Sequence, residues 1–179
     1  MSNLGVYWIK RGVKIMKKWI SIIALIMVIV AASGCTAQSS AKTYSGNNIS
    51  FQYPGNWSTD YNSSLQNLGN EGDVLVTLGK DNSGMAVAKA DTGSSNISAS
   101  TLASGFKTII QSKYQYISNK TVTVDGINAT QLVIKDSSNG DYGSLTFLNK
   151  NNSIYIIMIS TPDNNLQTIN MILNSFKFQ

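Results

Sequence analysis

Short runs that alternate hydrophobic and polar residues recur along the chain and predict β-strands. Residues rich in glycine, asparagine and aspartate separate these runs, and Asp125-Gly126 is the strongest two-residue hairpin signal among them. Strands joined by such short turns are antiparallel. The predicted strands are residues 49–53, 73–78, 85–90, 121–124, 127–134, 142–148 and 153–160.

One of these runs is hydrophobic at every position. Ile154 to Ile159 reads IYIIMI, so both faces of the predicted strand carry apolar side chains. A strand of this kind is covered on both faces of its sheet. We therefore expect it to lie at the centre of the sheet rather than at an edge.

Two segments show helical periodicity instead. From Ser98 to Ile117, apolar residues fall near every third or fourth position, and Ser98 or Ser100 is a suitable N-cap. Thr161-Pro162 resembles an N-cap followed by proline at the first helical position, which predicts a closing helix to about Asn174. Together the elements predict an α+β domain, an antiparallel sheet flanked by helices in an αβα sandwich.

The N-terminal segment differs from the rest of the chain. Lys17 and Lys18 precede an uncharged apolar run from Trp19 to Ala32. These 14 residues span roughly 21 Å as a helix, which is short of the roughly 30 Å hydrocarbon core of a membrane. The length favours a signal helix, and Met16 before it is an alternative start of translation.

The apolar run ends at the only cysteine of the chain. Ala32-Ser33-Gly34-Cys35 resembles a lipobox, in which the cysteine thiol is lipidated and the preceding peptide is removed. We therefore expect a signal peptide over 1–34, lipidated Cys35 with a short tether over 35–42, and one domain over 43–179. The alternative is an uncleaved N-terminal anchor with an incidental cysteine. Both interpretations place the domain at the cell membrane, facing outside.

Charge changes the first impression of a basic protein. The net charge is +5, but five of the 14 basic residues precede Trp19, which leaves nine lysines and nine acidic residues after it. A domain that is neutral after export has no electrostatic footprint for nucleic acid. Nucleic acid is therefore not an expected partner.

The missing residue types remove several kinds of chemistry. The sequence has no histidine and its one arginine is Arg11, so it offers neither a Ser-His-Asp triad nor a guanidinium clamp in the exported part. Lipidation of Cys35 also removes the only thiol nucleophile. The sequence predicts no enzyme and no cofactor, and a hydrolase is the least favoured of the functions considered.

A few residues remain as weak site candidates. Asp60, Glu71 and Asp73 offer carboxylate oxygens to a hard cation, although a solvated loop before a strand is the favoured explanation for them. Trp57, after the Pro54-Gly55 turn, is the best aromatic candidate for the rim of a binding site. Aromatic residues of this kind lie more often in the core.

Three segments carry a resemblance to a known family. They are the strand ISFQYPGNW over 49–57, the hairpin TVTVDGINA over 121–129, and the helix end ILNSFKF over 172–178. Together they resemble PsbP-like domains, a fold shared with the Mog family and with DcrB-type lipoproteins. The resemblance implies a central antiparallel sheet with flanking helices over 43–179. Related domains occur as lipoproteins in bacteria and in methanogenic archaea, and the high ratio of lysine to arginine suits such an archaeal source.

The resulting functional expectation is a lipid-anchored, extracytoplasmic PsbP-like module without catalytic activity. It would act as a binding or accessory part of an envelope or membrane complex, with the membrane and an unidentified protein as its partners. The alternative is a surface lipoprotein that binds a cation or a small molecule.

Overall fold

A computed structural model describes residues 40–59, 73–92, 97–111, 114–162 and 166–179 of the chain. They belong to a compact unit that spans Ser39–Gln179. The predicted signal peptide and Cys35 lie outside the described residues. Among the described helices, none is long and apolar enough to cross a membrane.

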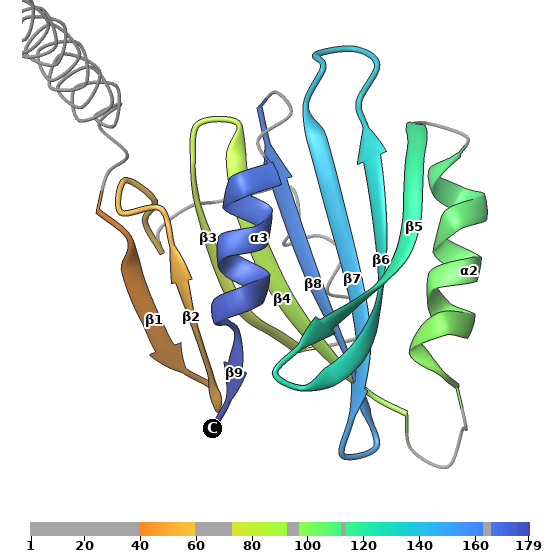
Figure 1. Ribbon diagram of the computed structural model, residues 1–179, viewed down its shortest axis with the longest axis horizontal. Helices are drawn as coiled ribbons and strands as arrows, with labels where there is room; N and C mark the ends of the chain where they lie inside the picture. The colour runs from red at the N-terminus through yellow and green to blue at the C-terminus, as the bar shows by residue number, and fades with distance from the viewer. Residues whose placement is uncertain (1–39, 60–72, 93–96, 112–113, 163–165) are drawn as a thin grey trace, which may run out of the picture. The chain divides into compact units, whose positions relative to one another are not determined.

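The larger of two sheets has six antiparallel strands in the order β3-β4-β8-β7-β6-β5 (Figure 1). Consecutive strands pair in β3–β4, β5–β6, β6–β7 and β7–β8. The remaining pair joins β8 to β4, which lies far from it in the sequence. The strand Ser153–Thr161 therefore lies inside the sheet, as its uninterrupted hydrophobic run predicted. The six strands are β3 Asp73–Lys80, β4 Ser83–Asp91, β5 Gln115–Val124, β6 Ile127–Lys135, β7 Tyr142–Lys150 and β8 Ser153–Thr161.

A second, smaller sheet was not predicted from the sequence. It has the order β1-β2-β9 and joins β1 Lys42–Gly46 and β2 Ile49–Tyr53 to β9 Lys177–Phe178. The polar strand β1 gives no hydrophobic signal, and β9 is two residues long. Two pairings between distant parts of the chain define β9, Ile49 with Phe178 and Ser50 with Lys177.

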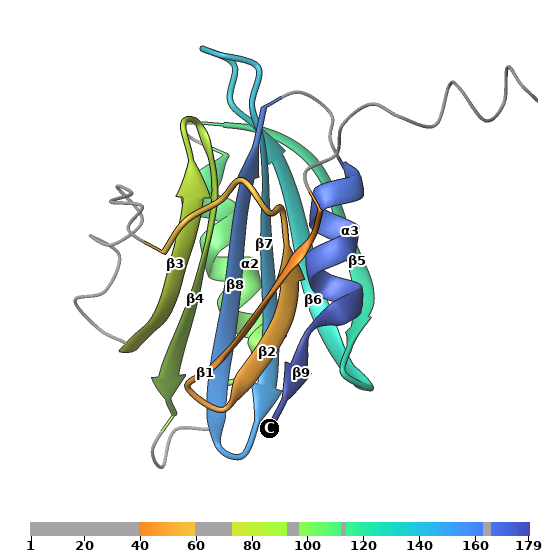
Figure 2. The ribbon, with the colours of Figure 1, turned by 90° about the vertical axis from the view of Figure 1, so that its left-hand side faces the viewer.

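The two helices pack on different sheets (Figure 2). Helix α2, Ala99–Ile110, packs on β6 and β7 of the main sheet. Helix α3, Leu166–Ser175, packs mainly on β2 of the small sheet. The predicted αβα sandwich is therefore correct only in part, because the small sheet and α3 together cover the face of the main sheet opposite to α2.

The core has two parts, one on each face of the main sheet. Beneath α2, the buried side chains of Ala103, Leu132 and Phe147 form a small cluster. On the other face a larger cluster joins the small sheet and α3 to the main sheet, with Phe51 and Phe176 stacked at 5.7 Å between ring centroids. Strand β8 contributes to both clusters, which explains its apolar side chains on both faces.

The boundaries of both helices differ from the predicted ones. The first helix ends at Ile110, and β5 begins at Gln115, so Ile117 belongs to a strand and lies at an irregularity of its pairing with β6. Ile117 is exposed and fits the helical spacing only by chance, which is why the predicted helix extended too far. Thr161, the predicted N-cap of the closing helix, is instead the last residue of β8, because its backbone continues the pairing with β7 opposite Tyr142.

The predicted turns are confirmed. Asp125 and Gly126 have φ of 49° and 75°, the left-handed pair that a two-residue hairpin turn requires. Ser98 caps α2 as expected, since its hydroxyl accepts a hydrogen bond from the Thr101 amide at 3.1 Å.

Removing the Phe176 ring should destabilise the domain strongly, because the ring is fully buried between the two sheets. We expect Phe176→Ala to lower the free energy of unfolding by about 3–5 kcal/mol in urea denaturation. Ile109→Ala on the exposed side of α2 is the control, with an expected change within about 0.5 kcal/mol. Equal effects of the two substitutions would contradict the core described here.

Candidate functional site

Of the residues singled out in the sequence as site candidates, the structure describes Trp57 and Asp73. Trp57 follows the Pro54-Gly55 turn as predicted, and its amide donates to the Pro54 carbonyl at 2.9 Å. The indole is 4% exposed and belongs to the large core cluster, so it packs inside the domain rather than at a rim. Asp60 and Glu71 lie outside the described residues.

Asp73 is the one described member of the predicted carboxylate set. It is exposed at the start of β3 and lies opposite Lys89 of β4. No three potential metal ligands gather anywhere among the described residues. With a lysine as its cross-strand neighbour, Asp73 faces a cation of the protein itself, which does not favour a bound metal ion.

The structure reveals instead a gradient of polarity across one face of the main sheet. This face is the one toward α3 and the small sheet, and residues directly opposite one another on adjacent strands form rows across it. One row near the middle of the strands has apolar side chains at the β3 edge, neutral polar side chains further along, and a lysine at the β5 edge. Along this row lie Val76, Val87, Ile157, Thr146, Gln131 and Lys120.

The polar part of the row is buried. Gln131 is 2% exposed and Thr146 is 0% exposed. The Gln131 Nε2 donates to the Ser144 hydroxyl at 2.8 Å, but Gln131 Oε1 and Thr146 Oγ1 have no hydrogen-bond partner among the described residues. Each such buried group costs about 1–3 kcal/mol when it is left unsatisfied.

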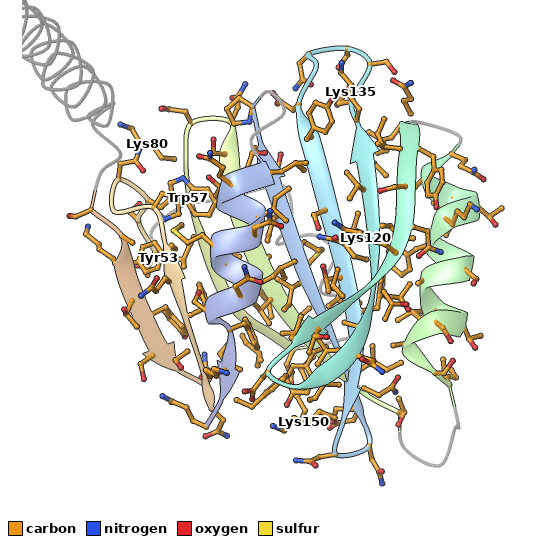
Figure 3. The ribbon with its side chains drawn as sticks, in the orientation of Figure 1. Tyr53, Trp57, Lys80, Lys120, Lys135 and Lys150 are labelled. Carbon is orange, nitrogen blue, oxygen red and sulfur yellow. The ribbon has the colours of Figure 1, made fainter. Side chains whose placement is uncertain are left out.

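Lys120 ends this row on the outermost strand. It is exposed on β5 and lies opposite Gln131, on the side of the strand that faces α3 (Figure 3). Within the described residues, no carboxylate forms an ion pair with Lys120. The row therefore ends in a positive charge that the described part of the domain does not neutralise.

The two edges of the main sheet differ in how many of their outer backbone groups are hydrogen-bonded. At the β3 edge, the Ser58 and Gly79 backbones exchange two hydrogen bonds of 3.0 Å, and the Asn47 side chain donates to the Leu75 carbonyl. These contacts occupy backbone groups that another strand would need. At the β5 edge, among the described residues, no hydrogen bond of this kind covers the backbone between Ser118 and Thr123.

The hydroxyl groups of this site have no acidic or basic side chain beside them among the described residues. The sequence has no histidine, and no carboxylate or lysine is hydrogen-bonded to the hydroxyl of Ser144 or Thr146. Its chemical resources are the backbone groups of a strand edge, one lysine and a set of neutral hydrogen-bonding side chains. Groups of this kind can form hydrogen bonds and one ion pair with another molecule.

Comparison with known proteins agrees with this fold. A sequence model of the family described as PsbP-like protein matches residues 29–178. The chain belongs to the PsbP-like protein family. This family is associated with accessory roles in protein complexes. No curated protein sequence matches the chain.

Solved structures show the same fold at low sequence identity. The PsbP-like domain resembles cyanobacterial PsbP from Synechocystis, with a TM-score of 0.55 and 17% identity over 82% of this chain and 96% of that one. It also resembles a protein from Bacteroides thetaiotaomicron, with a TM-score of 0.50 and 9% identity over 79% of this chain and 49% of that one. At these identities the likeness establishes the fold of the PsbP-like domain alone.

Sequence reasoning missed the polar row and Lys120. Gln131, Ser144 and Thr146 alternate with apolar residues on β6 and β7, so they look like the solvent-facing positions of ordinary strands. Only their burial marks them as unusual. A signal was available in Lys120, which stands next to Thr121 in a strand otherwise free of charge.

A carboxylate beside the site connects the C-terminus of the PsbP-like domain to the β5–β6 turn. Asp125 accepts a hydrogen bond from the Phe178 amide at 3.0 Å and forms an ion pair with Lys177 at 3.1 Å. The Phe178 amide, followed by Lys177, holds the pKa of Asp125 below its ordinary value. Asp91, hydrogen-bonded by Ser153 and paired with Lys89, likewise has a lowered pKa.

These lowered pKa values predict acid sensitivity. Since the pKa of Asp125 is lower in the folded state, its contribution is present above the ordinary carboxyl pKa of about 3.9 and is lost as the pH falls below it. We expect Asp125→Asn to reduce the fall in unfolding free energy between about pH 5 and pH 2. Asparagine tolerates the left-handed φ at this position, so the turn is kept.

Urea denaturation at a series of pH values measures this effect, with Asp73→Asn at an exposed carboxylate as the control. The residual acid sensitivity of the Asp125→Asn variant is assigned to Asp91 and Asp136, whose pKa values are also lowered. A pH profile unchanged by Asp125→Asn would contradict the role of the Phe178 and Lys177 contacts.

Two substitutions at buried polar side chains, one in the row and one beside it, should act in opposite directions. Thr146→Val removes a buried hydroxyl without a partner and should raise the free energy of unfolding by about 1 kcal/mol. Ser144→Ala leaves the Gln131 Nε2 without its acceptor and should lower the unfolding free energy by about 1–3 kcal/mol. Urea denaturation compares the two variants, and equal signs would contradict the hydrogen bonding described for the row.

Proposed function

We propose that this protein is a lipid-anchored accessory module that binds a protein partner at the outer side of the cell membrane. The observation that carries the proposal is membership of the PsbP-like family over residues 29–178, because proteins of this family associate with protein complexes. Lipidation of Cys35 would hold the domain at the membrane. Its role would be to bind rather than to catalyse.

The physical properties of the domain support a binding role. It has no histidine, and nine lysines balance nine acidic residues after Trp19, so no strong field attracts a polyanion. The described residues gather neither a metal site nor a nucleophile next to a base. The strand edge at β5, with its lysine, is the feature best suited to contact another protein.

The anchor is tested at Cys35. We expect the native protein to incorporate labelled fatty or isoprenoid lipid and to sediment with membranes. Cys35→Ser should lose the label and release the domain from the membrane fraction, since two or more lipid chains are needed for firm anchoring. Ser39→Ala in the tether is the matched control and should keep both the label and the membrane association.

The partner is tested by native purification from solubilised membranes. The wild-type protein should recover a defined protein complex that survives washing, and the Cys35→Ser variant should recover much less of it because it is no longer concentrated at the membrane. An unlabelled cytosolic protein would refute the location, and a monomer from native membranes would refute the accessory role.

A further inference from the structure

The outer edge of β5 carries unpaired backbone groups at three positions. Asp125 and Gly126 form a two-residue turn, so the flanking pair Val124–Ile127 exchanges both backbone hydrogen bonds. Pairs alternate along an antiparallel ladder, so Val122 and Lys120 also bond to β6. The amides and carbonyls of Asn119, Thr121 and Thr123 consequently point away from β6, and no described residue accepts or donates to them.

Apolar side chains lie next to this edge. Six large hydrophobic residues are exposed in the described part of the domain, and three of them fall between the end of α2 and the start of β5. Ile109 is 66% exposed, Tyr114 38% and Ile117 43%. Solvent-exposed apolar groups gathered beside a polar edge are typical of interaction surfaces.

Charge defines the chemistry of the occupant. Lys120 projects from β5 on the face toward α3, and its cross-strand neighbour Gln131 is neutral. A strand added outside β5 would place one of its side chains beside Lys120, where opposite charges stabilise and like charges destabilise the pairing. An acidic side chain on the added strand would pair with Lys120 at the end of the row.

We infer that the outer edge of β5 binds an extended, acidic segment of a partner protein, which adds a seventh strand to the main sheet. The segment pairs with β5 through backbone hydrogen bonds to Asn119, Thr121 and Thr123, and a carboxylate placed beside Lys120 determines the register of this pairing. Valine-like side chains of the segment contact Ile117 and Tyr114. The inference rests on the proposed function for the existence of a protein partner and names the surface and the class of segment.

The opposite edge shows why β5 is the binding edge. Ser58 and Asn47 occupy backbone groups of β3, so that edge is blocked in the way proteins protect their sheets from unwanted pairing. In Figures 1 and 2, β5 is the last strand of the main sheet, with no strand beyond it.

The test uses the full-length chain in detergent and two terminally blocked heptapeptides of alternating threonine and valine. One peptide carries glutamate at its centre and the other carries lysine. We expect the glutamate peptide to shift the NMR signals of Asn119, Thr121 and Thr123 and to bind about fivefold more tightly than the lysine peptide, as befits one exposed ion pair. Shifts confined to other elements, or no binding at millimolar peptide, would overturn the inference.

Two substitutions make the test specific. Thr121→Pro removes an outward amide, and proline is tolerated at such edge positions, so the domain should fold normally and bind the glutamate peptide at least about tenfold more weakly. Thr43→Pro, at an outward position of the β1 edge in the other sheet, is the matched control and should leave binding unchanged. Equal loss of binding in both variants would overturn the assignment to β5.

A charge reversal keeps the test informative if Thr121→Pro fails to fold. Lys120→Glu should reverse the preference, so that the lysine peptide becomes the tighter ligand, whereas Lys135→Glu at the far end of β6 should not. An unreversed preference would overturn the role of Lys120. Sedimentation that shows a wild-type dimer dissociated by Thr121→Pro would assign the edge to a second copy and overturn the inference.

These outcomes are independent of the native purification. If the peptides do not bind but a complex is recovered from membranes, the accessory role stands and the partner binds at another surface of the domain. Binding of the peptides without any recovered complex would support the edge and contradict the proposed function.

Discussion

The structure depends on one apolar contact between its two sheets. Phe51 of the small sheet and Phe176 after α3 stack at 5.7 Å and are buried with Ile49, Leu78 and Ile157 against the main sheet. An isolated two-stranded hairpin is at best marginally stable in water, and β9 adds only two residues to β1 and β2, so the small sheet depends on its burial against the larger sheet. The same contact fixes the position of α3 and of the C-terminal strand, and Asp125 then holds that strand to the β5–β6 turn.

This contact covers only part of the main sheet. Where it ends, the row across the sheet changes from Ile157 to Thr146 and Gln131, and the side chains become polar although they stay buried. Unpaired buried acceptors destabilise a core, so this half of the sheet gains less from burial than the other half. The outer backbone groups of the bordering strand, β5, also form no hydrogen bond with another described element. The less stabilised side of the sheet is thus also the side at which we propose that a partner binds.

Membership of the PsbP-like family fits this division of the molecule. The resemblance to cyanobacterial PsbP at 17% identity preserves the arrangement of strands and helices and does not specify a set of chemical residues. A fold that persists while its side chains change is maintained by burial, and its function depends on particular sites and not on the fold itself.

The sequence by itself determined most of the main sheet. Strand positions, the Asp125-Gly126 turn and the central place of β8 follow from local periodicity and turn chemistry, which depend on neighbouring residues alone. It also raised the family resemblance that the match over residues 29–178 confirms. Only the tertiary structure decided the rest, because it depends on residues far apart in the chain. The small sheet needs Ile49 beside Phe178, Trp57 became a core residue through packing, and Gln131 is distinguished from a surface residue only by what buries it.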